Sequence, residues 1–321
     1  MATFTFAPGD AMPPVCRDGA ITIGNFDGVH LGHQALVRET TNQAQHLGGP
    51  AVAITFDPPP IKLLRPELAR PPLTTIPYRT ALLHEHGADH VLVLRTSVPM
   101  LQLSATDFFH QIVVQGLGAK AMIEGFNFAF GRKREGTVDM LHALCAQNKL
   151  TLTLMPPQKL LDQPVSSSRI RAALETGDVQ AAAELLGRPH RVTGRVGPGQ
   201  KRGATIGFPT ANLHEVETLL PGVGVYAVRV HLVSPLPSAG EGLGVMGGTT
   251  WPGAANVGPN PTFGESALKV EVHLIGFSGD LYGSCLSVDF IRKLRDTKKF
   301  SNMQELTDQI RADVVAAANI I

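Results

Sequence analysis

The sequence predicts an α/β domain built on a parallel sheet, followed by an antiparallel β-barrel with a terminal helix. We place these domains at residues 1–187 and 188–321. Near-continuous apolar strands alternate with helical segments in the first half, a pattern typical of a parallel sheet covered on both faces. Short strands separated by dense turn signals fill the second half, a pattern typical of a small barrel. A chain of 321 residues is also long for one hydrophobic core.

The alternation in the first half can be followed segment by segment. Its helices end at glycines, which favour the left-handed backbone of a helix stop. Ligands of parallel sheets bind beyond the carboxyl ends of the strands, and informative polar residues follow Ile23, Phe56 and Ile123. The expected strands cover residues 20–23, 51–56, 90–94, 119–124 and 150–155, and the expected helices cover residues 34–46, 76–86 and 105–114.

The composition changes after Gly187, which ends a short Ala-rich helix at residues 179–186. Strand-like stretches follow, among them R-V-T-G-R-V, V-Y-A-V-R-V-H-L-V, K-V-E-V-H-L-I and S-V-D-F-I. Residues 234–253 are rich in Gly, Pro and Ser and predict a flexible insertion. An amphipathic helix is expected at residues 303–319.

The hydrophobic content of 43% and the charged content of 17% predict an ordinary soluble globular protein. Its formal charge is only +1 and it has no long block of Lys and Arg, so no nucleic-acid partner is expected. Cys16, Cys145 and Cys285 are scattered, which favours reduced thiols in the cytoplasm. We expect no signal peptide and no membrane span. The oligomeric state does not follow from the sequence.

The stretch I-T-I-G-N-F-D-G-V-H-L-G-H-Q, residues 21–34, is a candidate phosphate-binding turn. An apolar strand leads into a glycine-rich turn, where a helix N-terminus offers unpaired N–H groups. His30 and His33, three residues apart, share one helix face and can point at one anion. The alternative is a glycine turn with two solvated histidines. The candidate nucleotide-binding residues of this turn are Gly24, Asn25, Phe26, Asp27 and Gly28.

Other polar residues of the first half suit the chemistry of phosphate. The sequence has no P-loop motif, and its histidines and cysteines do not occur in zinc-binding patterns. Imidazoles, a helix N-terminus and arginine can stabilise a phosphorus centre during nucleotidyl transfer. For the serines the alternative is a helix cap, and for Asn127 it is a turn. The candidates are Asn127, Ser166, Ser168, Arg169 and Arg171.

In the second half the candidate site combines G-F-P-T-A-N-L with a carboxylate. Thr210 and Asn212 are two residues apart and share one face of an extended strand, and such hard oxygen ligands suit Mg²⁺ held with ATP. Gly207 and Pro209 of the same loop are candidate binding residues of this site. Glu271 stands opposite in phase to its apolar neighbours and is a candidate general base aimed into a barrel cleft. The alternatives are a strand edge after a Pro turn, and a solvated edge carboxylate for Glu271.

These stretches together resemble the bacterial bifunctional riboflavin kinase/FAD synthetase (FMN adenylyltransferase) over essentially the whole chain. G-N-F-D-G-V-H-L-G-H, T-F-D-P, G-F-N-F-A-F-G and S-S-S-R-I-R match its adenylyltransferase half in order. G-F-P-T-A-N-L, P-G-V-G-V-Y-A-V, N-V-G-P-N-P-T-F, V-E-V-H-L, D-L-Y-G and R-K-L-R-D match its riboflavin kinase half. The resemblance implies a Rossmann-like nucleotidyltransferase domain and a riboflavin kinase barrel.

The resemblance also implies a role for each candidate residue. Riboflavin and ATP would give FMN, and FMN and ATP would then give FAD and pyrophosphate. In the first domain, His30 and His33 would bind ATP phosphates, Asn127 would contact FMN and ATP, and Ser168, Arg169 and Arg171 would bind nucleotide phosphates. In the second, Thr210 and Asn212 would hold Mg²⁺ with ATP, and Glu271 would activate the riboflavin 5′-hydroxyl.

The chain departs from the family pattern at Pro59, Ala204 and Asn260, where the family often has His, Arg and Arg. Pro59 weakens one expected ligand contact, and Arg202 is a possible substitute for the arginine missing at Ala204. The insertion at residues 234–253 is longer than the usual hairpin loop. Two rival hypotheses stay open at this point. One is a nucleotidyltransferase for phosphopantetheine or nicotinate mononucleotide, and the other is a flavin-binding module without activity.

Overall fold

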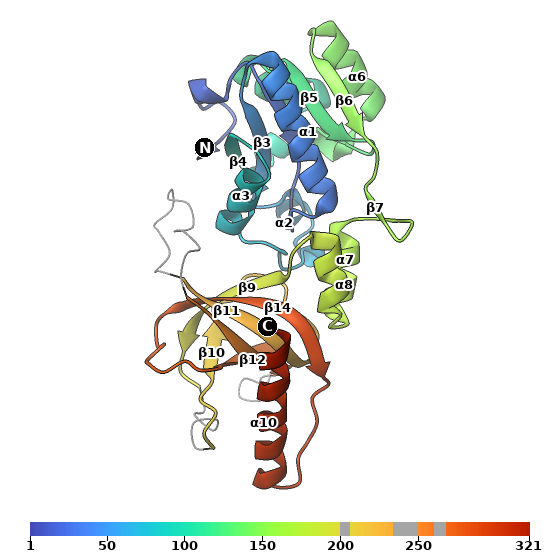
Figure 1. Cartoon of the computed structure of the whole chain (residues 1–321). Helices are drawn as coiled ribbons and strands as arrows, with labels where there is room; N and C mark the ends of the chain where they lie inside the picture. Colours follow the sequence, from blue (N-terminus) through green and yellow to red (C-terminus); the bar gives the residue numbers. More distant parts are fainter. Residues whose placement is uncertain (200–205, 234–248, 260–267) are drawn as a thin grey trace. The chain divides into compact units, whose positions relative to one another are not determined.

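A computed structural model describes residues 1–199, 206–233, 249–259 and 268–321 of the chain (Figure 1). The chain forms two compact units. The first unit contains Met1–Arg70 and Ile76–Val165, and the second contains Pro71–Thr75 and Ser166–Ile321. The histidine turn lies in the first unit, and the candidate residues of the barrel lie in the second.

The first unit is built on a six-stranded parallel sheet with the order β1-β4-β3-β2-β5-β6. Strands β2, β3 and β4 follow one another in one direction, and the chain then returns to place β5 on the other side of β2. The direction of winding therefore switches between β2 and β5, and ligands of such sheets bind beyond this point. The strands are β1 (Ala2–Phe6), β2 (Ala20–Ile23), β3 (Ala51–Asp57), β4 (His90–Arg95), β5 (Ala121–Gly125) and β6 (Thr151–Met155).

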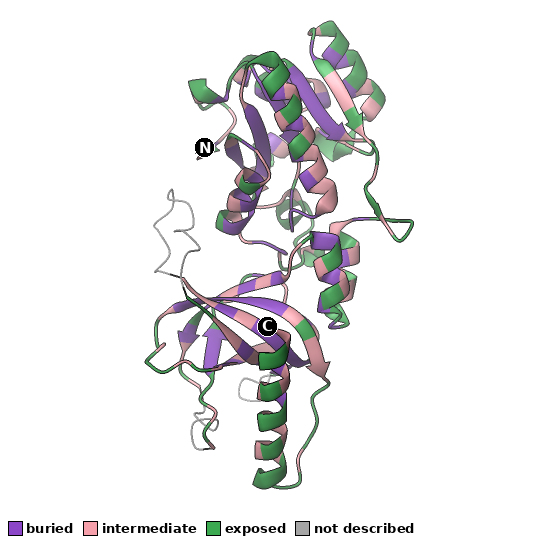
Figure 2. Cartoon of the chain, viewed as in Figure 1, coloured by how far each residue is buried: buried purple, intermediate pink, exposed green. Residues whose placement is uncertain are grey.

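The central strands of this sheet are buried, as the continuous apolar runs predict. All four residues of β2 are buried, and so are the first five of β3 (Figure 2). The predicted helix at residues 105–114 is a short α-helix, α5, continued by a π-helical segment, η3. Besides three short 3-10 helices, η1 (Pro14–Cys16), η2 (Pro66–Leu68) and η4 (Arg132–Arg134), the helical elements are α1 (Leu31–Leu47), α2 (Pro60–Leu64), α3 (Ile76–Glu85), α4 (Val98–Leu101), α5 (Ala105–Phe108), η3 (Phe109–Gly116) and α6 (Val138–Gln147).

The second unit contains a closed antiparallel barrel with the order β10-β13-β12-β11-β14-β9. Helices α7 (Ser167–Glu175) and α8 (Val179–Leu186) precede it, and α10 (Met303–Ile320) ends the chain. Both the parallel sheet and the barrel with its terminal helix are therefore confirmed. The strands are β9 (His190–Gly197), β10 (Ala211–His214), β11 (Gly224–Val233), β12 (Thr250–Pro259), β13 (Leu268–Leu274) and β14 (Cys285–Arg295).

Some expectations about segments need correction or stay open. The predicted insertion does not extend to residue 253, because residues 250–253 pair with β11 and β13 as the start of β12. The rest of that insertion, and the departures at Ala204 and Asn260, lie outside the described residues. Helices α7 and α8 belong to the second compact unit. The domain boundary near Gly187 describes which residues each activity needs, and it stays a prediction.

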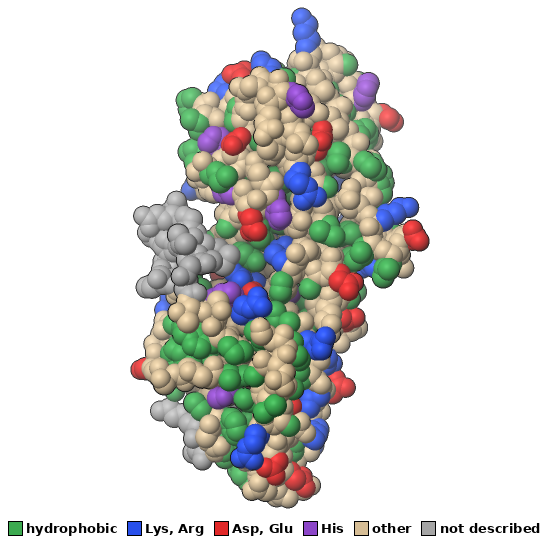
Figure 3. Space-filling view, in the orientation of Figure 1, with side chains coloured by type: hydrophobic (Ala, Val, Ile, Leu, Met, Phe, Trp, Pro, Cys, Tyr) green, Lys and Arg blue, Asp and Glu red, His purple; other side chains and the backbone are tan. Residues whose placement is uncertain are grey.

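The surface carries charges of both signs. On the face drawn in Figure 3, Lys and Arg side chains are interspersed with Asp and Glu. In the parts of the chain that the structure describes, no helix is long and apolar enough to cross a membrane.

Candidate functional site

The two predicted histidines lie where β2 leads into α1, at the carboxyl edge of the sheet. His30 is the N-cap residue of α1, and its Nδ1 accepts a hydrogen bond from the His33 backbone N–H at 3.4 Å. The two imidazoles are stacked, with ring centroids 3.6 Å apart and an angle of 16° between the planes. With Nδ1 acting as acceptor, the neutral His30 ring carries its proton on Nε2, a donor suited to a phosphate oxygen.

The backbone at Gly32, between the two histidines, leaves little room for a side chain. A Cβ at this position would lie 3.2 Å from two atoms of the His30 ring. That is closer than side chains normally pack, so a side chain here would displace the imidazole. The H-x-G-H spacing therefore keeps both rings together at the helix N-terminus, where the dipole favours anions.

A buried ion pair holds the turn before the histidines in place. Arg79 of α3 is 1% exposed, and its Nη2 lies 3.1 Å from Oδ1 of Asp27. Its Nη1 donates to Thr55 Oγ1 at 3.3 Å, and that hydroxyl donates to the Asn25 carbonyl at 3.0 Å. Asp27, expected among the nucleotide-binding residues, thus also holds the turn in place. Sequence reasoning missed Arg79, because α3 lies far along the chain from the motif.

The same turn contains residues in an unfavourable backbone conformation. Phe26 and Val29 have φ values of 46° and 40°, in the left-handed region that a β-branched residue rarely enters. Both side chains are buried, and the Val29 carbonyl accepts a hydrogen bond from the Gln34 side chain at 3.0 Å. Such local strain persists only where surrounding contacts impose it, and it is common at binding sites. The edge of the Phe26 ring packs against His33, with centroids 5.2 Å apart.

Asn127 lies across the switch point from the histidines, in the loop that follows β5. Its side chain is exposed, and its Oδ1 folds back over Gly125, 3.4 Å from where a Cβ would be. The Phe128 N–H donates to the Gly125 carbonyl at 3.0 Å, so this segment also forms the turn that was the alternative interpretation. The loops after β2 and β5 therefore place His30, His33 and Asn127 at the carboxyl ends of neighbouring strands.

The predicted serines and arginines lie at the start of α7, in the second compact unit. Ser166 caps this helix, since its Oγ accepts from the Arg169 N–H at 3.3 Å, as one of the alternatives expected. Ser168 is exposed, and Arg171 donates through Nη1 to the Pro71 carbonyl at 2.7 Å. Their role in binding nucleotide phosphates stays a prediction.

The barrel brings together the polar residues predicted for the second site. Asn212, Glu271 and Asn256 pair directly across β10, β13 and β12, so they form one row on the same face of the sheet. Val270 and Val272 fill the interior, which places Glu271 on the outer face of the barrel. Asn256 belongs to the quoted N-V-G-P motif, but sequence reasoning gave it no role.

Asn212 has an unusual environment within this row. It is 6% exposed, and its Oδ1 is buried without a hydrogen-bond partner. Gly199 lies against the amide group of Asn212, where any Cβ would clash with it. A buried acceptor without a hydrogen-bond partner costs free energy. A ligand that bonds to this oxygen removes that cost, which favours its binding. A hard cation is the natural ligand for such an oxygen.

The loop that enters β10 is open to solvent. Gly207 has a φ of 85° with nothing close to it, and Pro209 and Thr210 are exposed. His273 of β13 bonds through Nδ1 to the Pro209 carbonyl at 2.8 Å, which fixes the loop beside the row. Thr210 directly precedes β10 and is exposed, whereas Asn212 is the second residue of β10 and is buried, so a shared face stays a prediction.

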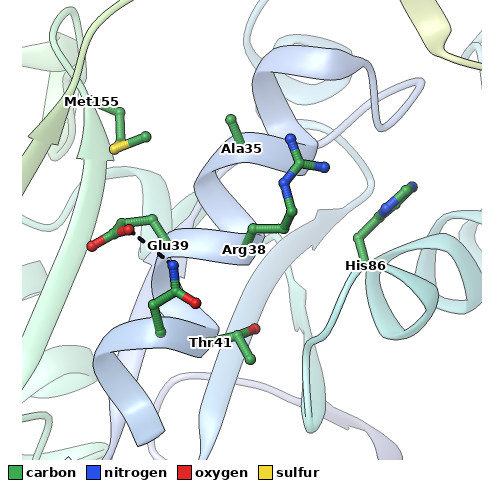
Figure 4. Close-up of a pocket in the computed structure, with 7 residues that line it drawn as sticks. Ala35, Arg38, Glu39, Thr41, His86 and Met155 are labelled. Carbon is green, nitrogen blue, oxygen red and sulfur yellow. Dashed lines mark hydrogen bonds between the residues drawn. The ribbon is translucent and has the colours of Figure 1, made fainter. Parts of the chain in front are cut away.

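A separate hollow of about 360 Å³ lies along the outer side of α1 (Figure 4). In it, Glu39 accepts a hydrogen bond from Asn42, while Arg38 and His86 lie at the other side. No predicted site residue lines this hollow. Its lining residues are Ala35, Arg38, Glu39, Thr41, Asn42, His86 and Met155.

Both halves of the chain match family models. The FAD synthetase model matches residues 13–169, and the riboflavin kinase model matches residues 186–321. The bifunctional riboflavin kinase/FMN adenylyltransferase of Pseudomonas fluorescens is 38% identical over 305 residues, which cover 95% of this chain and 93% of that protein. The chain belongs to the bifunctional riboflavin kinase/FMN adenylyltransferase family.

Further comparisons agree over the whole length. The family member of Escherichia coli strain K12 is 34% identical, covering 92% of this chain and 91% of that protein. The crystal structure of a macrolide-efflux protein from Streptococcus pneumoniae is similar to this chain with a TM-score of 0.86 and 30% identity, and 99% of each chain is covered. As a family member, the chain is a riboflavin kinase and FMN adenylyltransferase that converts riboflavin to FMN and FMN to FAD. This confirms the resemblance and disfavours both rival hypotheses.

Proposed function

We propose that the switch point between β2 and β5 is where FMN is adenylylated. His30 and His33 bind the ATP phosphates and stabilise the charge that develops as pyrophosphate leaves. Asn127 contacts FMN and ATP from the loop after β5. At the start of α7, Ser166, Ser168, Arg169 and Arg171 are proposed to bind nucleotide phosphates. The stacked imidazoles at a helix N-terminus carry this proposal, because adenylyl transfer needs electrostatic stabilisation more than a protein nucleophile.

The outer row of the barrel is the proposed site of riboflavin phosphorylation. Thr210 and Asn212 hold Mg²⁺ with the phosphates of ATP, and Glu271 accepts the proton of the riboflavin 5′-hydroxyl. The buried Oδ1 of Asn212 supports the metal assignment.

Two single variants separate the proposed sites. His30→Ala should abolish FAD formation and leave FMN formation intact, and Glu271→Ala should do the reverse. The matched controls are His46→Ala and Glu217→Ala, which change exposed residues of the same types in the same units. Riboflavin, ATP and Mg²⁺ are incubated, and FMN and FAD are followed by chromatography. Loss of both activities in either folded variant would contradict the two-site proposal.

The same assay tests the departure at Pro59, the N-cap residue of α2. Pro59→His should increase the apparent affinity of the adenylyltransferase site and leave riboflavin phosphorylation unchanged. FMN that accumulates without FAD in the native enzyme would identify Pro59 as a lesion. We also propose a cytoplasmic enzyme with ATP, riboflavin and FMN as its ligands and no nucleic-acid partner.

A further inference from the structure

The parallel sheet opens at the switch point, below the proposed adenylyltransferase site. Strands β2 and β5 pair only at Ala20 with Ala121 and Ile21 with Met122. Their outer neighbours stay paired further, β2 with β3 up to Ile23 and β5 with β6 up to Gly125. The two strand ends therefore separate from each other while each remains attached to the sheet.

One side chain occupies this opening. Oε1 of Glu124 accepts a hydrogen bond from the Ile23 backbone N–H at 2.7 Å. In an uninterrupted ladder that N–H would bond to a carbonyl of β5 and hold the strands about 4.8 Å apart. The carboxyl group thus replaces a backbone acceptor, which satisfies the N–H while the strand ends stay apart.

Glu124 is buried in a setting that does not favour a charge. It is 1% exposed, and burial raises its pKa well above the ordinary value of 4.5, although the bond from Ile23 acts in the opposite direction. Burying a carboxyl group costs free energy unless the group forms hydrogen bonds or pairs with a charge. Glutamine, which is neutral and of the same length, is therefore the closest substitute.

This contact joins the two strands that lead into the loops of the proposed site. Ile23 is followed directly by the turn that carries His30, and the next N–H, of Gly24, bonds to Ile54 of β3 at 3.0 Å. Glu124 is followed directly by Gly125, over which Asn127 folds. The position of Glu124 therefore sets the separation between the histidine turn and the Asn127 loop.

We propose that Glu124 is a positioning residue for FMN adenylylation. Its Oε1 acts as the hydrogen-bond acceptor that holds β2 and β5 apart, so that a nucleotide reaches the histidines between the two loops. The inference rests on the proposed adenylyltransferase site. It requires the acceptor and its reach, and it requires no proton transfer by Glu124.

Two variants test acceptor and reach separately. Glu124→Gln keeps the length and an acceptor oxygen but removes the acid, and it should retain kcat and KM for FMN adenylylation within about threefold, well inside the tenfold that 1.4 kcal/mol represents. Glu124→Asp keeps the acid but is shorter by one methylene and cannot reach Ile23. It should lower kcat on the order of 100-fold, as displaced catalytic groups do, with a smaller effect on KM.

The second activity of the same chain is the control for folding. Both variants should phosphorylate riboflavin at the native rate, as should Met122→Leu, a volume-conserving change on the same strand. The proposal is overturned if Glu124→Gln loses as much as Glu124→Asp, if Glu124→Asp keeps the native kcat, or if Glu124→Asp lowers both activities together. His30→Ala is measured in parallel. If it retains FAD formation, the proposed site itself is wrong, whereas its inactivity beside an active Glu124→Asp refutes only the role of Glu124.

Discussion

Replacing Arg79 should destabilise the first unit strongly, because it strands a buried charge. In Arg79→Met, Asp27 loses a guanidinium 3.1 Å away, at a site where the two side chains are 1% and 12% exposed. Removing one partner of a buried ion pair costs about 3–5 kcal/mol, because the remaining charge loses the opposite charge that offsets its desolvation. The bond from Arg79 to Thr55 is lost as well. We therefore expect a loss of unfolding free energy of about 3–5 kcal/mol in this unit.

The matched control is an exposed ion pair in the same unit. Lys120 and Asp18 lie 3.2 Å apart, but their side chains are 54% and 64% exposed. Lys120→Met should therefore cost no more than about 1 kcal/mol. The double variant Arg79→Met, Asp27→Asn should recover part of the loss, because it removes the stranded charge.

Urea unfolding of the full chain distinguishes the two units. Trp251, the single tryptophan, lies in β12, so its fluorescence reports the barrel. Far-UV circular dichroism reports both units, and the Arg79 variants should shift only the transition that fluorescence does not follow. FMN adenylylation should fall and riboflavin phosphorylation should persist, because the turn before His30 loses its support. A cost for Arg79→Met no larger than that for Lys120→Met would refute the reasoning.

Two further predictions concern the helix N-terminus and the barrel. Gly32→Ala should keep or raise the unfolding free energy, since Ala favours a helix by up to about 1 kcal/mol over Gly. It should nevertheless lower the rate of FMN adenylylation, because the new Cβ crowds His30. A fully active variant would contradict this prediction. In the barrel, burial acts to raise the pKa of Asp289, but hydrogen bonds from Arg191 and His231 outweigh it and hold the pKa below 3.8. The unfolded chain therefore binds this proton first as the pH falls, so the stabilisation is complete above about 3.8 and is lost through the lower folded pKa. Asp289→Asn should reduce the unfolding free energy of the barrel at pH 7, as measured by Trp251 fluorescence. This loss relative to the native chain should shrink toward pH 3. An equal loss at both pH values would refute the lowered pKa of Asp289.

Local patterns were sufficient to predict most of the fold. Apolar strands such as Ala51–Asp57 and glycine stops such as Gly48 are decided by residues close in sequence, and the structure confirms them. The edge strand Ala2–Phe6 and the helix Val138–Gln147 were missed. β1 alternates polar and apolar residues, but it is only five residues long and gains its place by pairing with β4, almost ninety residues later. That pairing is a tertiary contact, which a local pattern does not contain.

The candidate sites show the same limit at the level of single residues. The motif spacing predicts that His30 and His33 share one helix face, because residues three apart lie on the same side of a helix. The shared face of Thr210 and Asn212 stays a prediction. Asn256 was missed because its place beside Glu271 depends on the register of β12 against β13. A shift of one residue in that register would turn Asn256 to the other face. Such a residue is found only once the pairing is known.

Arg79 and Glu124 share one physical property that explains both why they were missed and why they matter. Each is 1% exposed and ionisable, and each bonds to the turn before His30 or to the strand that leads into it. In the sequence, Arg79 lies in a predicted helix and Glu124 at the end of an apolar strand, where neither stands in a motif. A buried ionisable side chain persists only where a specific partner compensates its desolvation. Asp27, the partner of Arg79, belongs to the strained turn, and Ile23, the partner of Glu124, ends the strand that leads into it. Both buried groups therefore act on the geometry of the turn that carries the histidines.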